Sequence, residues 1–270
     1  MTVQIGGTGK IVLLDRAAQP AGLWYGAGDP GSMPVVSIRE LRCSNDHVLT
    51  SSNGMIIKQE GMSDKQELSI VDSVSGNRSI IDCREIVLDP SESQLKEESY
   101  FEPFANGRCD ISSSGRVAYA PLRNRWLVVV RDIGGGGIVL DREWSPVRRT
   151  EEKKEAVWNA LGGTDDCVAM DHEPAVGRIR RRPDGKLWVE PLGINPGDGA
   201  IVCFDEFSHS GELLRRVQVE IPNASGDDEL KILEDGRFAV LRGFGSSTDG
   251  IGSVTPQVLL AVIERHADSD

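Results

Sequence analysis

The sequence has no long apolar run, few aromatic residues and none of the short motifs that mark common catalytic sites. No hydrophobic stretch approaches the roughly 20 residues that a membrane-spanning helix needs. A Gly-x-Ser-x-Gly nucleophile motif is absent, as is a Cys-x-x-Cys pair. Aromatic residues make up 5% of a chain that contains 30 Gly and 13 Pro, which fits many turns between short strands. We therefore expect no membrane insertion.

Positive charge is also in short supply. Lys and Arg number 30 against 42 Asp and Glu, which gives a formal net charge of −12. Such a balance disfavours contact with nucleic acid or with anionic membranes. A basic group is the local exception, and we interpret it as a solvated strand and turn rather than an anion site: Arg178, Arg180, Arg181, Arg182 and Lys186.

The cysteines predict neither a disulfide framework nor a cysteine-ligated zinc site, because there are 5 and no two are spaced as metal ligands. Cys43, Cys83 and Cys203 lie in apolar runs, where a free cysteine behaves as a small hydrophobe. Cys167 lies in a polar segment, which makes it the one candidate for a reactive thiol. Residues 1–7 contain neither the basic nor the apolar part of a signal peptide. The expected location is the cytoplasm, or the periplasm or exterior if a leader has been removed.

What the sequence does contain is a repeated pattern of short strands and tight turns. In its clearest copy, an Asp184-Gly185 turn opens a strand to Glu190, and strands follow at 200–205 and 213–219. Similar units span 35–88, 108–144 and 227–266. A polar loop is expected at 52–66. Thr150 can cap a helix that the glycines at 162–163 end, so one short inserted helix is expected near 150–161.

A repeated unit of four antiparallel strands predicts a β-propeller, because such units bury both faces only by stacking around an axis. Four to six blades fit the spacing of the turns. We expect a single domain over 1–270, closed into a ring by strands at 10–25 that pair with the last blade at 227–266. Within a blade, the tight turns fall on one side and the long connections on the other. The glycines at 134–137 are interpreted as a hairpin turn rather than a phosphate-binding loop.

Several stretches resemble bacterial six-bladed β-propellers of the NHL/TolB-like family. The segment 26–31, Gly-Ala-Gly-Asp-Pro-Gly, is similar to the stretch that follows an early strand in that family. Residues 144–152 resemble the start of its inter-blade helix, and 185–189 with 204–205 and 211–213 look like its most regular blade. The usual acidic residue after the early motif is Ser32 here. The resemblance implies the fold and, in many members, export from a bacterial cell.

The densest group of potential metal ligands lies just after the expected helix. Asp165, Asp166, Asp171, His172 and Glu173 offer carboxylate and imidazole ligands. An acidic solvated loop is the simpler interpretation, because adjacent carboxylates usually diverge. The alternative is a Ca²⁺ or Zn²⁺ site built from Asp171, His172 and Glu173, which would serve a metal-dependent hydrolase or lactonase at the mouth of the propeller channel.

No arrangement of residues predicts a catalytic site, and only His172 is well placed for acid–base chemistry. We therefore expect a non-enzymatic protein without a cofactor that binds a protein, peptide or glycan through its long connections. Trp188 is assigned to the core rather than to a ligand platform. The candidate ligand-binding residues share a position in or beside the long connections, and they are Arg125, Trp158, His172, Asn195 and Asp249.

Overall fold

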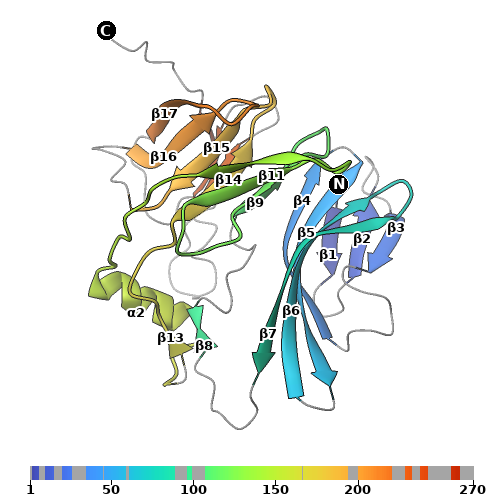
Figure 1. The fold of residues 1–270 in the computed structure, drawn as a ribbon, viewed down its shortest axis with the longest axis horizontal. Coiled ribbons are helices and arrows are strands. Elements are labelled where there is room, and N and C mark those ends of the chain that lie inside the picture. The colour runs from blue at the N-terminus through green and yellow to red at the C-terminus, as the bar shows by residue number, and fades with distance from the viewer. Residues whose placement is uncertain are drawn as a thin grey trace. The chain divides into compact units, whose positions relative to one another are not determined.

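The fold is made mainly of antiparallel sheets, within which tight turns join successive strands (Figure 1). The structure is a computed structural model, and it describes residues 2–5, 10–14, 20–25, 35–44, 46–58, 61–88, 96–98, 107–165, 167–193, 200–220, 229–232, 238–242 and 257–261. Two compact units are present, Met1–Ile179 and Arg180–Asp270, and each is described separately. Their boundary falls inside strand β14, whose sheet is given with the second unit.

Where the structure describes it, the first unit holds three antiparallel sheets, a short parallel strand pair and a ten-residue helix. A three-stranded sheet contains β1 (Thr2–Ile5), β2 (Lys10–Leu14) and β3 (Pro20–Tyr25). The next has four strands in sequence order, namely β4 (Val35–Ser44), β5 (His47–Lys58), β6 (Gly61–Asp72) and β7 (Arg78–Leu88). The third contains β9 (Cys109–Ile111), β10 (Val117–Tyr119), β11 (Leu127–Arg131) and β12 (Gly137–Asp141). The helix is α2 (Glu151–Ala160).

The second unit repeats the same topology. A four-stranded sheet runs through β14 (Val176–Arg181), β15 (Leu187–Pro191), β16 (Ala200–Phe207) and β17 (Leu213–Glu220). A three-stranded sheet contains β18 (Glu229–Ile232), β19 (Phe238–Arg242) and β20 (Gln257–Ala261). The predicted all-β class, the four-stranded antiparallel units and the helix near 150–161 are confirmed. Ring closure between 10–25 and 227–266 stays a prediction.

One hairpin turn recurs in several of these sheets. Its first residue donates a backbone hydrogen bond to the fifth, and a glycine at the fourth position donates back to the first. That glycine has a positive φ in each case, which L side chains rarely adopt. The turn occupies residues 112–116, 132–136, 182–186 and 208–212. A shared turn geometry explains why the repeat was visible in the sequence.

The predicted polar loop at 52–66 is wrong. These residues belong to a long hairpin, in which β5 and β6 pair continuously from His47↔Asp72 to Lys58↔Gly61. Ser52 and Gln66 are buried rather than solvated. The polar side chains of this segment favoured a loop in the sequence. The pairing of β5 with β6 depends on contacts between the two strands, which the composition of the segment does not show.

Burial follows the same order in each four-stranded sheet. Consecutive buried residues occupy β5 over 48–52, β10 over 117–119 and β15 over 187–189. Since successive side chains of a strand point to opposite faces, these strands are covered on both faces. The fourth strands are mostly exposed, as the large apolar residues Val87 on β7, Val139 on β12 and Leu213 on β17 illustrate. Each sheet therefore has a covered middle and an exposed outer edge.

Two consecutive sheets of the first unit pack face to face. Leu49, Leu68 and Ile70 of the β4–β7 sheet form one buried cluster with side chains of the β9–β12 sheet, namely Cys109, Ile111, Val117 and Tyr119. Arg131 of β11 also donates a hydrogen bond to the carbonyl of Ile81 on β7, at 2.7 Å. In the described part of the chain, no helix has the length and apolar character required to cross a membrane.

The tetraglycine is a hairpin turn, as predicted, because Arg131 pairs with Gly137 across it. Alanine at its positions is expected to give graded effects. Gly137→Ala should lower the free energy of unfolding by about 2–4 kcal/mol, since its Cβ would overlap the Val130 carbonyl oxygen at a φ of 153°. Gly136→Ala should cost about 1–2 kcal/mol from its φ of 84° alone. Gly134→Ala, which meets open space, is the control and should be near neutral in urea denaturation. Equal losses at all three positions would contradict this turn geometry.

Candidate functional site

The insertion after β12 carries α2, and the sequence defines both ends of this helix. The Thr150 side chain accepts a hydrogen bond from the Lys153 amide, and Glu151 and Glu152 lie in the first turn, where they favour the positive end of the helix dipole. At the other end, the Gly163 amide donates to the Trp158 carbonyl at 3.0 Å. None of the residues of α2 is buried. The helix therefore contributes little to a core.

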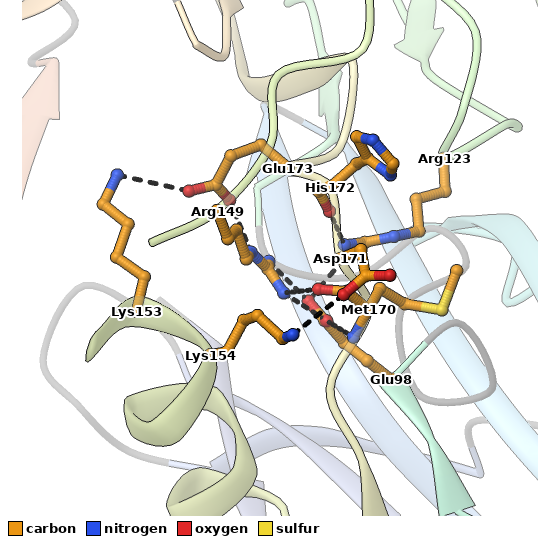
Figure 2. Close-up of polar contacts among 9 residues, drawn as sticks. All are labelled: Glu98, Arg123, Arg149, Lys153, Lys154, Met170, Asp171, His172 and Glu173. Carbon is orange, nitrogen blue, oxygen red and sulfur yellow. Dashed lines mark hydrogen bonds and ion pairs between the residues drawn. The ribbon is translucent and has the colours of Figure 1, made fainter. Parts of the chain in front are cut away.

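Backbone hydrogen bonds fix the two ends of this insertion against each other. Arg149 donates its amide to the Asp171 carbonyl at 2.8 Å, and Glu173 donates its amide to the Val147 carbonyl at 2.9 Å. Between them, the strand β13 (Cys167–Val168) pairs in parallel with β8 (Lys96–Glu97). These contacts bring Glu98, which follows β8, to the base of the insertion (Figure 2).

Glu98 is the centre of a buried ion cluster. Its side chain is 5% exposed and receives two hydrogen bonds from the Arg149 guanidinium, of which Nη2 to Oε1 measures 2.7 Å. Arg123 Nη1 lies 3.2 Å from the same carboxylate, and the Met170 amide donates to it at 3.1 Å. A buried carboxylate is tolerated only when opposite charges and donors surround it in this way.

Arg149 links this centre to a second carboxylate. Its Nε donates to Glu173 Oε2 at 2.9 Å, and Lys153 of α2 lies 3.2 Å from Glu173 Oε1. Burial alone would lower the pKa of Arg149, but hydrogen bonds to Glu98 and Glu173 raise it above its usual value. Burial likewise works to raise the pKa of Glu173, and Arg149 and Lys153 outweigh it, so this pKa is lowered. The Arg149 and Glu173 side chains are therefore both charged at neutral pH.

The candidate metal ligands Asp171, His172 and Glu173 diverge (Figure 2). Lys154 lies 2.9 Å from the Asp171 carboxylate and lowers its pKa, whereas Glu173 faces Arg149 and Lys153. The His172 side chain is exposed, and its carbonyl accepts a hydrogen bond from Arg123 at 2.7 Å. Within the described ranges, no group of three or more His, Cys, Asp or Glu residues is arranged to hold a metal ion. The Ca²⁺ or Zn²⁺ alternative stays a prediction.

The other predicted binding residues are placed as follows. Arg125 lies in the exposed β10–β11 loop and pairs with Asp141, with Nε 3.2 Å from Oδ1. Trp158 is half-buried and donates its indole N–H to the Thr164 carbonyl at 3.1 Å. Asn195 and Asp249 lie outside the described residues. The structure connects the Arg125 loop to the His172 segment, because the neighbouring Arg123 binds the carbonyl of His172.

The cysteine assignments need correction. Cys43 and Cys83 are exposed, although their apolar neighbours predicted burial. Cys167, the predicted reactive thiol, is buried, and its sulfur lies 3.2 Å from the Leu161 carbonyl oxygen. Thr164 and Leu161 contact the Cys167 sulfur, and the thiol is shielded from solvent.

Sequence reasoning missed the three residues at the centre of the cluster. Glu98 follows an acidic stretch that looks solvated, and Arg149 is preceded by Arg148, which has the same chemistry but is exposed. The alternation of an extended segment, in which neighbours point to opposite sides, separates the two arginines. This alternation could be used only once residues 147–149 were known to be extended.

Comparison of the sequence with models of known protein families and with curated proteins finds no match.

Proposed function

We propose that the chain is a β-propeller that binds a protein, peptide or glycan through the face that carries its long connections, and that it is not an enzyme. Three features support the propeller. Four-stranded sheets repeat with one turn geometry, two consecutive sheets of the first unit pack face to face, and each four-stranded sheet has a covered middle and a mostly exposed fourth strand. Blades arranged around an axis have these properties. The blade number is expected to be four to six.

The observation that carries the binding function is the contrast between α2 and its base. No residue of the helix is buried, yet the insertion is fastened by a buried cluster of Glu98, Arg149 and Arg123. Buried ion pairs add little to stability compared with apolar packing, so core stability does not explain the cluster. A fixed surface helix is useful for recognition, because a rigid loop loses less entropy on binding.

The topology supports one binding side. In the β9–β12 sheet, the turns at 112–116 and 132–136 close one end, and the Arg125 loop and the α2 insertion follow strands that end at the other. Arg125 and His172 are exposed at this loop-bearing end, while Ser114 is exposed at the turn end. Connections on a rigid scaffold commonly carry binding residues.

Photo-crosslinking at these positions tests the proposal. A photoreactive amino acid replaces Arg125, His172 or Ser114 in the full chain, which is irradiated in its own cell extract and also applied to a glycan array. We expect one and the same adduct, or glycan binding weakened at least about tenfold, for Arg125 and His172 but not for the control Ser114. Equal adducts at Ser114 would refute the assignment of binding to the end that carries Arg125 and His172. If no position gives an adduct and no glycan on the array is bound, the binding function is refuted.

A further inference from the structure

The buried ion cluster joins segments that are far apart in the sequence. Glu98 belongs to the connection between β7 and β9, Arg149 and Met170 to the insertion after β12, and Arg123 to the β10–β11 loop. One carboxylate thus receives hydrogen bonds or ion pairs from three partners, at 3.2 Å or less. Figure 2 shows these groups converging on Glu98.

The strand pair beside this cluster is too short to be stable by itself. β8 and β13 pair in parallel over two residues each, Lys96↔Cys167 and Glu97↔Val168. Parallel pairs are slightly weaker per residue than antiparallel ones, and even a two-stranded hairpin is marginal in water. Glu98 directly follows β8, and Met170 lies two residues after β13, so the hydrogen bond from the Met170 amide to the Glu98 side-chain carboxylate ties the ends of the two strands together. The ion cluster is therefore the anchor of this small sheet.

Each arginine also has a second partner on the insertion or its flank. Arg149 retains Glu173, and Arg123 retains the His172 carbonyl. Both arginines share the side chain of Glu98. Without this carboxylate, two buried guanidinium groups would lie close together with less compensating charge, and like charges repel in a poorly solvated site.

We propose that Glu98 is a latch that makes residues 96–98 and the insertion 147–173 order and open as one cooperative element on the β9–β12 sheet. Neither segment keeps its place when the carboxylate is lost, because β8 then lacks its anchor and the arginines lack their common partner. The coupling does not depend on the proposed binding function.

Hydrogen exchange of the full chain, followed by mass spectrometry, tests the latch. Glu98→Gln is expected to speed exchange at least about tenfold in peptides covering 96–98 and in peptides covering 167–173, with little change over 117–131. The matched control is Glu152→Gln, which makes the same chemical change on the exposed surface of α2 and should leave all these peptides unchanged. Faster exchange in only one of the two segments, or in neither, would overturn the coupling.

A second variant protects the test from a chain that fails to fold. Arg149→Lys keeps the positive charge but cannot form the bidentate contact with Glu98. It is expected to speed exchange in the same two segments together, by a smaller factor than Glu98→Gln. A change confined to residues 147–173 would show that the two segments open independently, and the latch would be wrong.

Discussion

Replacing Trp188 by alanine is expected to lower the free energy of unfolding by about 3–5 kcal/mol. The side chain is 1% exposed and stacks on Phe204, with ring centroids 5.2 Å apart. Its indole N–H donates to Glu206 Oε1 at 3.0 Å, and the Arg182 guanidinium lies 4.7 Å from the ring centroid. Alanine would leave a large cavity and remove the donor of a buried carboxylate.

Trp188→Phe separates the two contributions. Phenylalanine keeps the apolar ring but loses the hydrogen bond to Glu206, so we expect a loss of about 1–3 kcal/mol. Burial works to raise the pKa of Glu206, and hydrogen bonds from Trp188 and Arg215 outweigh it, so this pKa is lowered below 4.5. A carboxyl group whose pKa is lower in the folded than in the unfolded state stabilises the fold at pH values above its unfolded-state pKa. This stabilisation is lost as the pH falls through the folded-state pKa. The phenylalanine variant should therefore lose less stability than the native chain on acidification below about pH 4.5.

The measurement is urea denaturation followed by far-UV circular dichroism, since the substitution removes a fluorophore. Trp158→Ala is the control, because that side chain is half-buried on α2 and makes one hydrogen bond to a backbone carbonyl, so it should cost at most about 1 kcal/mol. If Trp188→Ala costs no more than Trp158→Ala, Trp188 is not a core residue, and its alternative role as a ligand platform becomes the better explanation.

The sequence predicted those features that local chemistry determines. The helix at 151–160 follows from Thr150, the acidic first turn and the glycines at 162–163, and its bounds were correct within a residue. The repeated turn depends on one glycine in the left-handed region, so Gly115 and Gly185 marked it directly. Strand existence was predictable for the same reason, because alternation and turn residues act within a few positions.

The missed features depend on partners that are distant in the chain. Ser52 and Gln66 are polar, and only their positions in a hairpin of two twelve-residue strands bury them. Glu98 and Arg149 are separated by 51 residues, and their contact requires β8 and β13 to pair. No local pattern distinguishes these charged residues from solvated ones. A buried ion cluster is therefore the kind of site that composition and spacing predict least well.

Arg149→Met is expected to lower the free energy of unfolding by about 3–5 kcal/mol, because it leaves two carboxylates with too little compensating charge. Arg149 is 5% exposed on its side chain and contacts both Glu98 and Glu173. Arg123 remains beside Glu98 and Lys153 beside Glu173, but the guanidinium that contacts both carboxylates is lost. Urea denaturation, followed by tryptophan fluorescence, gives the measurement.

A matched control comes from the exposed pair of Arg125 and Asp141, whose side chains are 56% and 42% exposed. Arg125→Met removes the same guanidinium and the same charge, but solvent replaces it, so the loss should be at most about 1 kcal/mol. The ratio of the two losses in unfolding free energy measures how much burial increases the cost of removing an arginine from its carboxylate partners. Equal losses for Arg149→Met and Arg125→Met would show that the cluster is solvated in solution.

A double-mutant cycle then tests whether Arg149 and Glu98 act as a pair. Glu98→Leu alone leaves two buried arginines, whereas the combined Glu98→Leu, Arg149→Met variant removes both charges and replaces them with apolar side chains of similar volume. Replacing a buried ion pair in this way is often close to neutral. The double variant should thus be more stable than the sum of the single losses predicts, by about 1–3 kcal/mol. Additive losses would mean that Arg149 and Glu98 do not act as a pair. Glu98 would then be held by the Met170 amide and by Arg123 of the β10–β11 loop.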